Sequence, residues 1–207
     1  MKLHFKDIRW LLLLPLVFNL LLLTPLLGDG FPKGGDRIGH LLMAAKTKEV
    51  LQHFFATGEL RLWQDWHFMG SPLFYYYSPL PAVTLAVIGI VTGADLLLLY
   101  KLTVMLFYLF IPFTVYFCST LFGVEKKAAV LAALLSVLPV SIYGFGFEYR
   151  AFFDFGLFTQ LFGTLLFMLG FAACYRFVFV EKTFRYRWFF LSSIFTALAF
   201  LSHILAG

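Results

Sequence analysis

The sequence predicts an all-α integral membrane protein, with about five transmembrane helices and a pair of juxtamembrane helices in a long first outer loop. Three observations support this fold class. Hydrophobic residues make up 61% of the chain and charged residues 13%, whereas soluble domains contain roughly 45–50% and about 25%. The apolar residues form long continuous runs, as membrane-spanning helices do. These runs also lack the alternation of apolar and polar residues that a membrane β-barrel needs.

The first apolar run, Trp10–Gly28, is long enough to cross about 30 Å of hydrocarbon at a rise of about 1.5 Å per residue. Lys2, Lys6 and Arg9 precede it, so a cleaved secretory signal is the alternative. However, the run is longer than the usual apolar core of about 7–15 residues in a signal, and no small-x-small cleavage site follows it. We therefore predict a retained first span with a cytoplasmic N-terminus.

A long loop, residues 29–95, follows the first span and holds the only polar region of any size. Apolar positions such as Ile38 and Phe55 alternate with polar ones from Asp36 onward, which predicts an amphipathic helix lying on the membrane surface. Asp36 is a suitable N-cap for this helix and Gly58 a suitable stop. The next apolar run, Pro79–Thr92, has only about 14 residues and suits an interfacial or re-entrant helix.

The later apolar runs predict further spans, at Leu96–Phe122, Ala128–Tyr143, Phe155–Val180 and Trp188–Ala206. The positive-inside rule then decides whether Pro79–Thr92 crosses. If it does not, the basic pairs around Lys126 and Arg187 join the N-terminus on the cytoplasmic side. The outer face then holds the long first loop, the short loop Gly144–Asp154 and His203.

No internal boundary divides the chain, so residues 1–207 are expected to form one transmembrane module. The sequence ends at Gly207 directly after an apolar run, without a polar tail. We expect this module to be the N-terminal part of a longer protein.

Asp36 and His40 are the first candidates for chemistry. They lie one helical turn apart, so both can face the same side of the predicted surface helix. Such a pair suits a general base, a metal ligand or a contact to a phosphate or hydroxyl group. The simpler interpretation is that Asp36 only caps the helix and that His40 is solvated.

Arg150, Asp154 and His203 are the other candidates on the predicted outer face. Arg150 is able to hold a phosphate with two hydrogen bonds, and Asp154 is able to join Asp36 at a divalent cation. Alternatively, Arg150 forms an ion pair with Asp154 or Glu148, and Asp154 caps a helix. His203 suits a ligand contact or, more simply, an interfacial position.

The remaining patterns exclude several other functions. The basic residues are scattered between apolar runs and not gathered into a nucleic-acid-binding surface. The sequence also contains no glycine-rich phosphate loop followed by Lys-Ser/Thr, and no HExxH, GxSxG or CxxC motif.

Two motifs carry a resemblance to a known superfamily: GGDRIGH at Gly34–His40 and GSPLFYYYSPLP at Gly70–Pro81. Together with the acidic second loop EYRAFFDF, they resemble the GT-C membrane glycosyltransferases, which use polyprenyl-phosphate-linked sugars. The Gly-x-Pro-Leu-Phe-Tyr stretch is most similar to the membrane proteins labelled "6-pyruvoyl-tetrahydropterin synthase-related", a label that does not indicate pterin chemistry. The resemblance covers essentially the whole chain as an N-terminal module.

The resemblance implies transfer of a sugar to an acceptor at the outer membrane face. Asp36 then matches the acidic residue that activates the acceptor or helps to bind a metal, and Asp154 matches the acidic position of the second outer loop. His40, Arg150 and His203 are expected to contact the substrate. The second loop has no paired acidic motif, so a divalent cation such as Mg²⁺ or Mn²⁺ is left open. The later spans and C-terminal domain that usually complete the donor site are not in this sequence, so the module alone is expected to be inactive.

Two other functions fit the layout. A transporter or flippase for lipid-linked intermediates should place ionisable residues near the bilayer midplane and contain internal repeats. Neither feature is found in the sequence. A non-catalytic membrane subunit is the third interpretation. All three predict membrane lipid as a partner and none predicts a nucleic acid.

Overall fold

The computed structural model of the protein describes residues 8–28, 30, 36–64, 71–74, 78–138, 158–181, 183 and 185–203. In this part nearly all regular structure is helical, and a two-residue strand pair is the exception. In chain order the elements are η1 (Ile8–Leu12), α1 (Leu13–Leu23), η2 (Thr24–Leu27), α2 (Arg37–Thr57), β1 (Trp63–Gln64), β2 (Ser71–Pro72), α3 (Pro79–Thr92), α4 (Leu96–Leu121), α5 (Lys126–Leu135), α7 (Phe158–Tyr175), η3 (Arg176–Val180) and α8 (Tyr186–Ser202).

Three helical stretches of the described chain are long and apolar enough to cross a membrane. They are Ile8–Leu27, Leu96–Leu121 and Phe158–Val180, with 20, 26 and 23 residues. Each coincides with a predicted span to within a few residues, which is consistent with an α-helical membrane protein. The helices α3 and α8 are apolar but shorter, with 14 and 17 residues. By length, the described residues therefore contain three candidate spans and not the five predicted.

The fourth helix of the prediction, Ala128–Tyr143, differs most from the structure. Here α5 begins earlier, at Lys126, and ends at Leu135, where the chain enters a turn at Ser136. Ten residues of helix extend about 15 Å, half of the hydrocarbon thickness. Residues 139–143 of the predicted span lie outside the described residues.

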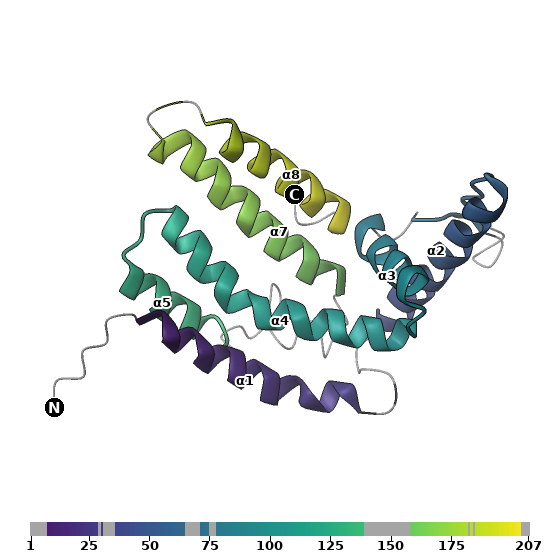
Figure 1. Cartoon of the computed structure of the whole chain (residues 1–207), viewed down its shortest axis with the longest axis horizontal. Helices are drawn as coiled ribbons and strands as arrows, with labels where there is room; N and C mark the ends of the chain where they lie inside the picture. Colours follow the sequence, from purple (N-terminus) through teal and green to yellow (C-terminus); the bar gives the residue numbers. More distant parts are fainter. Residues whose placement is uncertain are drawn as a thin grey trace.

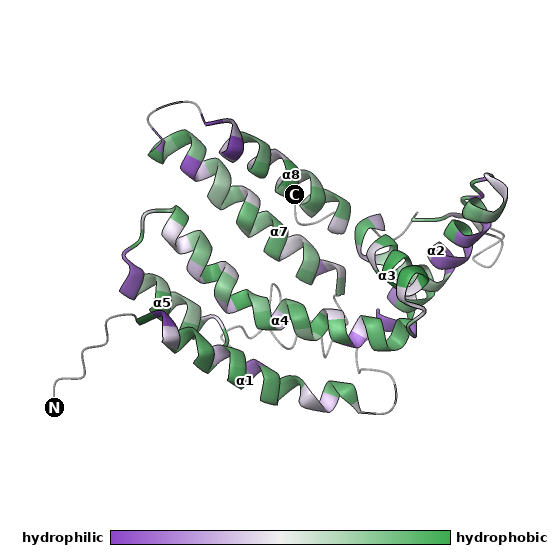
Figure 2. Cartoon of the chain, viewed as in Figure 1, coloured by the Kyte–Doolittle hydropathy of each residue, from purple (hydrophilic) through white to green (hydrophobic). Residues whose placement is uncertain are grey.

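The helices form a bundle with two distinct ends. Figure 1 shows α1, α4 and α7 side by side, with α8 against α7 and α5 beside the start of α1. One end, which we call the α2 end, holds α2, α3 and the first residues of α4 and α7. The opposite end, which we call the basic end, holds the starts of η1, α5 and α8. In Figure 2 the bundle helices are mostly apolar, and hydrophilic residues gather near these ends and along α2.

The core of the bundle lies around α4, where residues of α1, η2, α2, α3 and α7 pack against it. Its members are Leu23, Leu26, Ala44, Leu85, Tyr100, Val104, Met105, Tyr108, Ile111, Phe158, Leu161, Phe162 and Leu165. The opposite faces stay exposed and apolar. Leu21 is 69% exposed on α1, for example, and Phe110 is 55% exposed on α4. Contiguous apolar surface of this extent is rare on soluble proteins and is expected where helices face lipid.

A hydrogen bond between α1 and α4 compensates for a proline in the middle of α4. Pro112 has no N–H, so it leaves the Tyr108 carbonyl without its donor four residues later. The Asn19 side chain of α1 donates its amide Nδ2–H to this carbonyl at 2.7 Å. Asn19 is 4% exposed, so the bond lies inside the bundle. An orphaned carbonyl is costly in an apolar interior, and a polar side chain from a neighbouring helix restores its pairing.

A close approach joins α7 and α8. A Cβ atom on Gly170 of α7 would lie 2.8 Å from the Thr196 Oγ1 atom and 3.3 Å from the Phe195 Cβ atom of α8. Only a residue without a side chain fits this contact. The α7–α8 pair is therefore a helical hairpin that packs through a small residue.

Candidate functional site

The α2 end brings together the two motifs that the sequence marks for function. Leu73, directly after β2, and the start of α3 belong to the second motif, and both pack against α2, which follows Asp36. Leu73 of the second motif is 7% exposed and contacts a cluster with Met43 and Val50 of α2 and Ala82 of α3. Segments about thirty residues apart in sequence thus pack together at the α2 end.

The buried stripe of α2 differs from the predicted one. Its residues recur at helical spacings of three and four, and they are His40, Met43, Ala44, Thr47 and Val50. Ile38 and Phe55, which the prediction places on the apolar face, are 62% and 67% exposed. The stripe faces α3 and the starts of α4 and α7. Bulky apolar residues can remain outside because a membrane surface tolerates them.

Asp36 lies at the N-cap position of α2, as predicted, but its side chain does not cap the helix. Within α2 its carboxylate accepts no capping hydrogen bond, whereas its carbonyl accepts the His40 N–H at 3.1 Å. The residue is exposed. Since the capping role is not filled, the carboxylate is available for other contacts. Gly58 ends the helix in a left-handed conformation with φ of 76°, which confirms the predicted stop.

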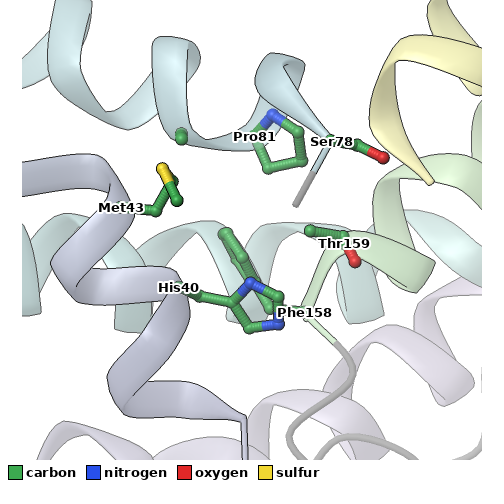
Figure 3. Close-up of a pocket in the computed structure, with 7 residues that line it drawn as sticks. His40, Met43, Ser78, Pro81, Phe158 and Thr159 are labelled. Atoms are coloured by element: carbon green, nitrogen blue, oxygen red, sulfur yellow. The ribbon is translucent and has the colours of Figure 1, made fainter. Parts of the chain in front are cut away.

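His40 is buried, so the interpretation of a solvated histidine is wrong. Its side chain is 5% exposed and its ring lies 5.8 Å from the Phe158 ring at the start of α7. Figure 3 shows it among Met43, Ser78, Pro81 and Thr159, at the meeting point of α2, α3 and α7. These residues leave no room even for a water molecule. The His40 junction is therefore a closely packed contact between α2, α3 and α7.

Tyr100 and Lys101, at the start of α4, extend this junction. The Tyr100 ring is fully buried and lies 4.4 Å from the Phe158 ring, on the same side chain that His40 contacts. A chain of rings thus connects His40 to the first turns of α4.

Lys101 is an ionisable residue inside an apolar helix. It is 6% exposed, and its Nζ atom donates a hydrogen bond of 2.6 Å to the carbonyl of Gly28, which follows the first span. This contact ties the end of η2 to the start of α4. It also puts a positive charge near the α2 end, where burial strengthens its field.

The other predicted site residues do not join this junction in the part of the chain that the structure describes. Arg150 and Asp154 lie outside the described residues, as does the loop Gly144–Asp154 as a whole. The helix that follows them, α7, begins at Phe158 beside His40. His203 is partly buried at the end of α8, where its backbone N–H donates to the Ala199 carbonyl, and it is not among the residues around His40.

No group of three metal-binding side chains occurs among the residues that the structure describes. Asp36 alone offers one carboxylate, whereas Mg²⁺ and Mn²⁺ are usually held by several oxygen ligands. The predicted Asp36–Asp154 pair involves a residue outside the described ranges.

No known protein family, curated protein or solved structure matches the chain. The function must therefore be argued from the residues and their arrangement. Within that arrangement, Tyr100, Lys101 and Phe158 were missed by the sequence prediction. Lys101 had a usable signal, because a charge within an apolar helix is costly and seldom without a role. Tyr100 and Phe158 had none, since they are aromatic residues in a chain that is 20% aromatic.

Proposed function

We propose that the chain is a GT-C-type glycosyltransferase module, which transfers a sugar from a polyprenyl-phosphate-linked donor to an acceptor at the outer membrane face. One observation carries the proposal. The two motifs of the resemblance meet at the α2 end, where the exposed Asp36 lies one helical turn before His40, and the buried His40 ring contacts Phe158. The site thus combines a reactive group at the surface with rigid positioning below it.

Asp36 acts as the general base in this proposal. Its carboxylate takes the proton of the acceptor hydroxyl, the acceptor oxygen bonds to the anomeric carbon of the sugar, and the bond from that carbon to the phosphate oxygen breaks. The polyprenyl phosphate leaves with the electron pair. Arg37 and Lys101 supply nearby positive charge that favours this leaving group, and Arg150 is the predicted further contact. His40 is a positioning residue, since it is buried beneath the surface.

The proposed topology puts this site outside the membrane. Both ends of α3 lie at the α2 end (Figure 1), which supports a helix that does not cross. At 14 residues it extends about 21 Å, short of the hydrocarbon thickness. Five crossings then place Arg9, Lys126, Lys127, Arg185 and Arg187 at the cytoplasmic face, in agreement with the positive-inside rule.

The amphiphilic nature of the donor also supports this placement. A polyprenyl-phosphate sugar keeps its lipid in the bilayer and its phosphate and sugar at the surface. Asp36 lies nine residues after the candidate span Ile8–Leu27 and precedes a helix with exposed Ile38 and Phe55. A helix of this kind can lie at the lipid–water boundary, which is also where the phosphate of the donor lies.

The test compares Asp36→Asn with Asp95→Asn. Both aspartates are exposed and directly precede a helix at the α2 end, but only Asp95 caps its helix, by accepting from the Leu98 N–H at 3.0 Å. Asparagine caps equally well, so neither change should alter the melting temperature. The assay follows release of undecaprenyl phosphate from radiolabelled undecaprenyl-phosphate hexoses by the whole protein in proteoliposomes that contain its native lipids as acceptors.

We expect Asp36→Asn to lower the rate about 100-fold or more, and Asp95→Asn to leave it within about twofold. An Asp36→Asn variant that keeps its rate refutes the assigned base. Failure of the unmodified protein to release the lipid from any hexose donor refutes the transferase and favours the transporter or subunit.

A further inference from the structure

A cluster of three arginines and a tryptophan surrounds Glu181 at the basic end. Its members, which we call the Glu181 cluster, are Arg176, Glu181, Arg185, Arg187 and Trp188. They come from the last turn of the α7–η3 stretch, the connection that follows it and the first turn of α8. The cluster thus lies where a candidate span ends, at Val180, far from the α2 end (Figure 1).

The Glu181 carboxylate organises the cluster. Its Oε1 atom accepts from Arg176 Nε at 3.1 Å and from Trp188 Nε1 at 3.0 Å, and its Oε2 atom lies 3.0 Å from Arg185 Nε. The Glu181 side chain is only 9% exposed. The guanidinium carbons of Arg176 and Arg187 also lie over the Trp188 ring, at 5.4 Å and 5.0 Å from its centroid. Charge-assisted bonds and cation–π contacts hold the group in one geometry.

Glu181 engages only part of the hydrogen-bond donors and positive charge of the arginines. Glu181 pairs with the Nε atoms of Arg176 and Arg185, and each guanidinium carries two further nitrogens with N–H groups. Arg185 is 50% exposed and Arg187 is exposed as well. One carboxylate against three guanidinium groups gives the cluster a net positive charge of two at neutral pH. Among the described residues, Glu181 is the only acidic side chain with an ion pair to these arginines, so the cluster is a preorganised group of donors with a net positive charge.

We propose that the Glu181 cluster binds the phosphodiester headgroup of an anionic phospholipid. The position of the cluster favours a lipid. It borders the apolar stretch Phe158–Val180, and its own Trp188 is half-buried, as tryptophans in the headgroup region are. A phosphate matches the forked guanidinium donors, and the net positive charge of the cluster attracts the negative charge of the phosphodiester. This binding does not depend on the proposed glycosyl transfer, since it lies at the other end of the bundle.

Three variants test the proposal in the whole protein. Arg185→Gln with Arg187→Gln removes two charges from the cluster, and Lys126→Gln with Lys127→Gln removes two from the start of α5 at the same end. Glu181→Gln keeps all three arginines but removes the carboxylate that positions them. Native mass spectrometry of protein released from mixed micelles measures retained phosphatidylglycerol against phosphatidylcholine, and thermal melting checks that each variant folds.

We expect the arginine double variant to lose phosphatidylglycerol affinity about 25-fold, from about fivefold per arginine. The lysine double variant should stay within about twofold. Glu181→Gln should bind phosphatidylglycerol more weakly although its net charge is more positive. Equal losses in both double variants, or tighter binding by Glu181→Gln, would show unspecific charge attraction and refute a built site. Displacement of the lipid by millimolar inorganic phosphate would refute the lipid as the occupant.

Discussion

The bond from Asn19 to the Tyr108 carbonyl gives the sharpest test of the bundle. Replacing Asn19 by leucine keeps a side chain that branches at Cγ and removes the donor that Pro112 makes necessary. Interhelical hydrogen bonds inside membrane proteins contribute about 0.6 kcal/mol on average. A buried acceptor that loses its donor costs about 1–3 kcal/mol. We therefore expect Asn19→Leu to lower the free energy of unfolding by about 1–2 kcal/mol.

The proline makes this effect conditional. In a Pro112→Ala background, residue 112 has an N–H that can donate to the Tyr108 carbonyl in the ordinary helical pattern. Asn19→Leu should then cost about 0.5 kcal/mol or less, so the two changes should couple by about 1 kcal/mol in a double-mutant cycle. Reversible unfolding in detergent micelles, followed by circular dichroism, measures each free energy.

Thr24→Val is the matched control. The Thr24 hydroxyl donates to the Leu20 carbonyl at 2.8 Å, but that carbonyl also accepts the backbone N–H of Thr24. Its loss should cost less than about 0.5 kcal/mol, because no acceptor is left without a donor. The reasoning is wrong if Asn19→Leu is as mild as Thr24→Val, or if its cost is the same with and without Pro112.

Three further predictions concern other contacts. Gly170→Leu should separate α7 from α8 and destabilise the protein by about 3 kcal/mol or more, because even a Cβ atom would lie 2.8 Å from Thr196 Oγ1. Gly170→Ala should be intermediate. Thermal melting in detergent measures this, and equal stability of the unmodified protein and both variants would contradict it. Lys101→Met should lower the free energy of unfolding by about 1.5–3 kcal/mol, since the Gly28 carbonyl loses a charged donor. If the first span stays equally protected against proteolysis in this variant, the Lys101–Gly28 hydrogen bond does not have the assigned role. For Glu181, burial alone would raise the pKa, but hydrogen bonds from Arg176 and Trp188 and the charges of Arg185 and Arg176 outweigh it and lower the pKa. The carboxylate therefore stabilises the hairpin fully above the ordinary glutamate range and loses this effect as the pH falls through the lowered pKa. The difference in melting temperature between the unmodified protein and Glu181→Gln should be constant from pH 7 to about 5 and shrink below about 4, and a difference that grows on acidification would contradict the assignment.

The sequence was most informative where a local signal was sufficient. Pro79–Thr92 was predicted with the bounds that the structure has, because a proline begins the helix and Gly93 ends it in a left-handed conformation with φ of 70°. Gly58 ended α2 for the same reason. The long spans were equally visible, since continuous apolar residues have no other stable arrangement.

The sequence was less informative where packing between distant segments decides. Ile38 and His40 are close in α2, yet the apolar side chain is exposed and the histidine is buried, because His40 lies on the side of α2 that packs against α3 and α7. The Asn19–Pro112 relationship could not be predicted either, since it depends on which helix lies beside α4. For Arg150 and Asp154, the predicted roles stay predictions.

The account depends on the α2 end and the basic end lying on opposite sides of the membrane, and cysteine accessibility tests this most directly. Single cysteines at Gln52 in α2, Asp95 before α4 and Lys127 in α5 are introduced after Cys118 and Cys174 are replaced by alanine. A membrane-impermeant maleimide is then added to intact cells. The account predicts labelling at positions 52 and 95, and labelling at 127 only after permeabilisation. Labelling of 52 and 127 from the same side, or of 52 and 95 from opposite sides, would contradict it.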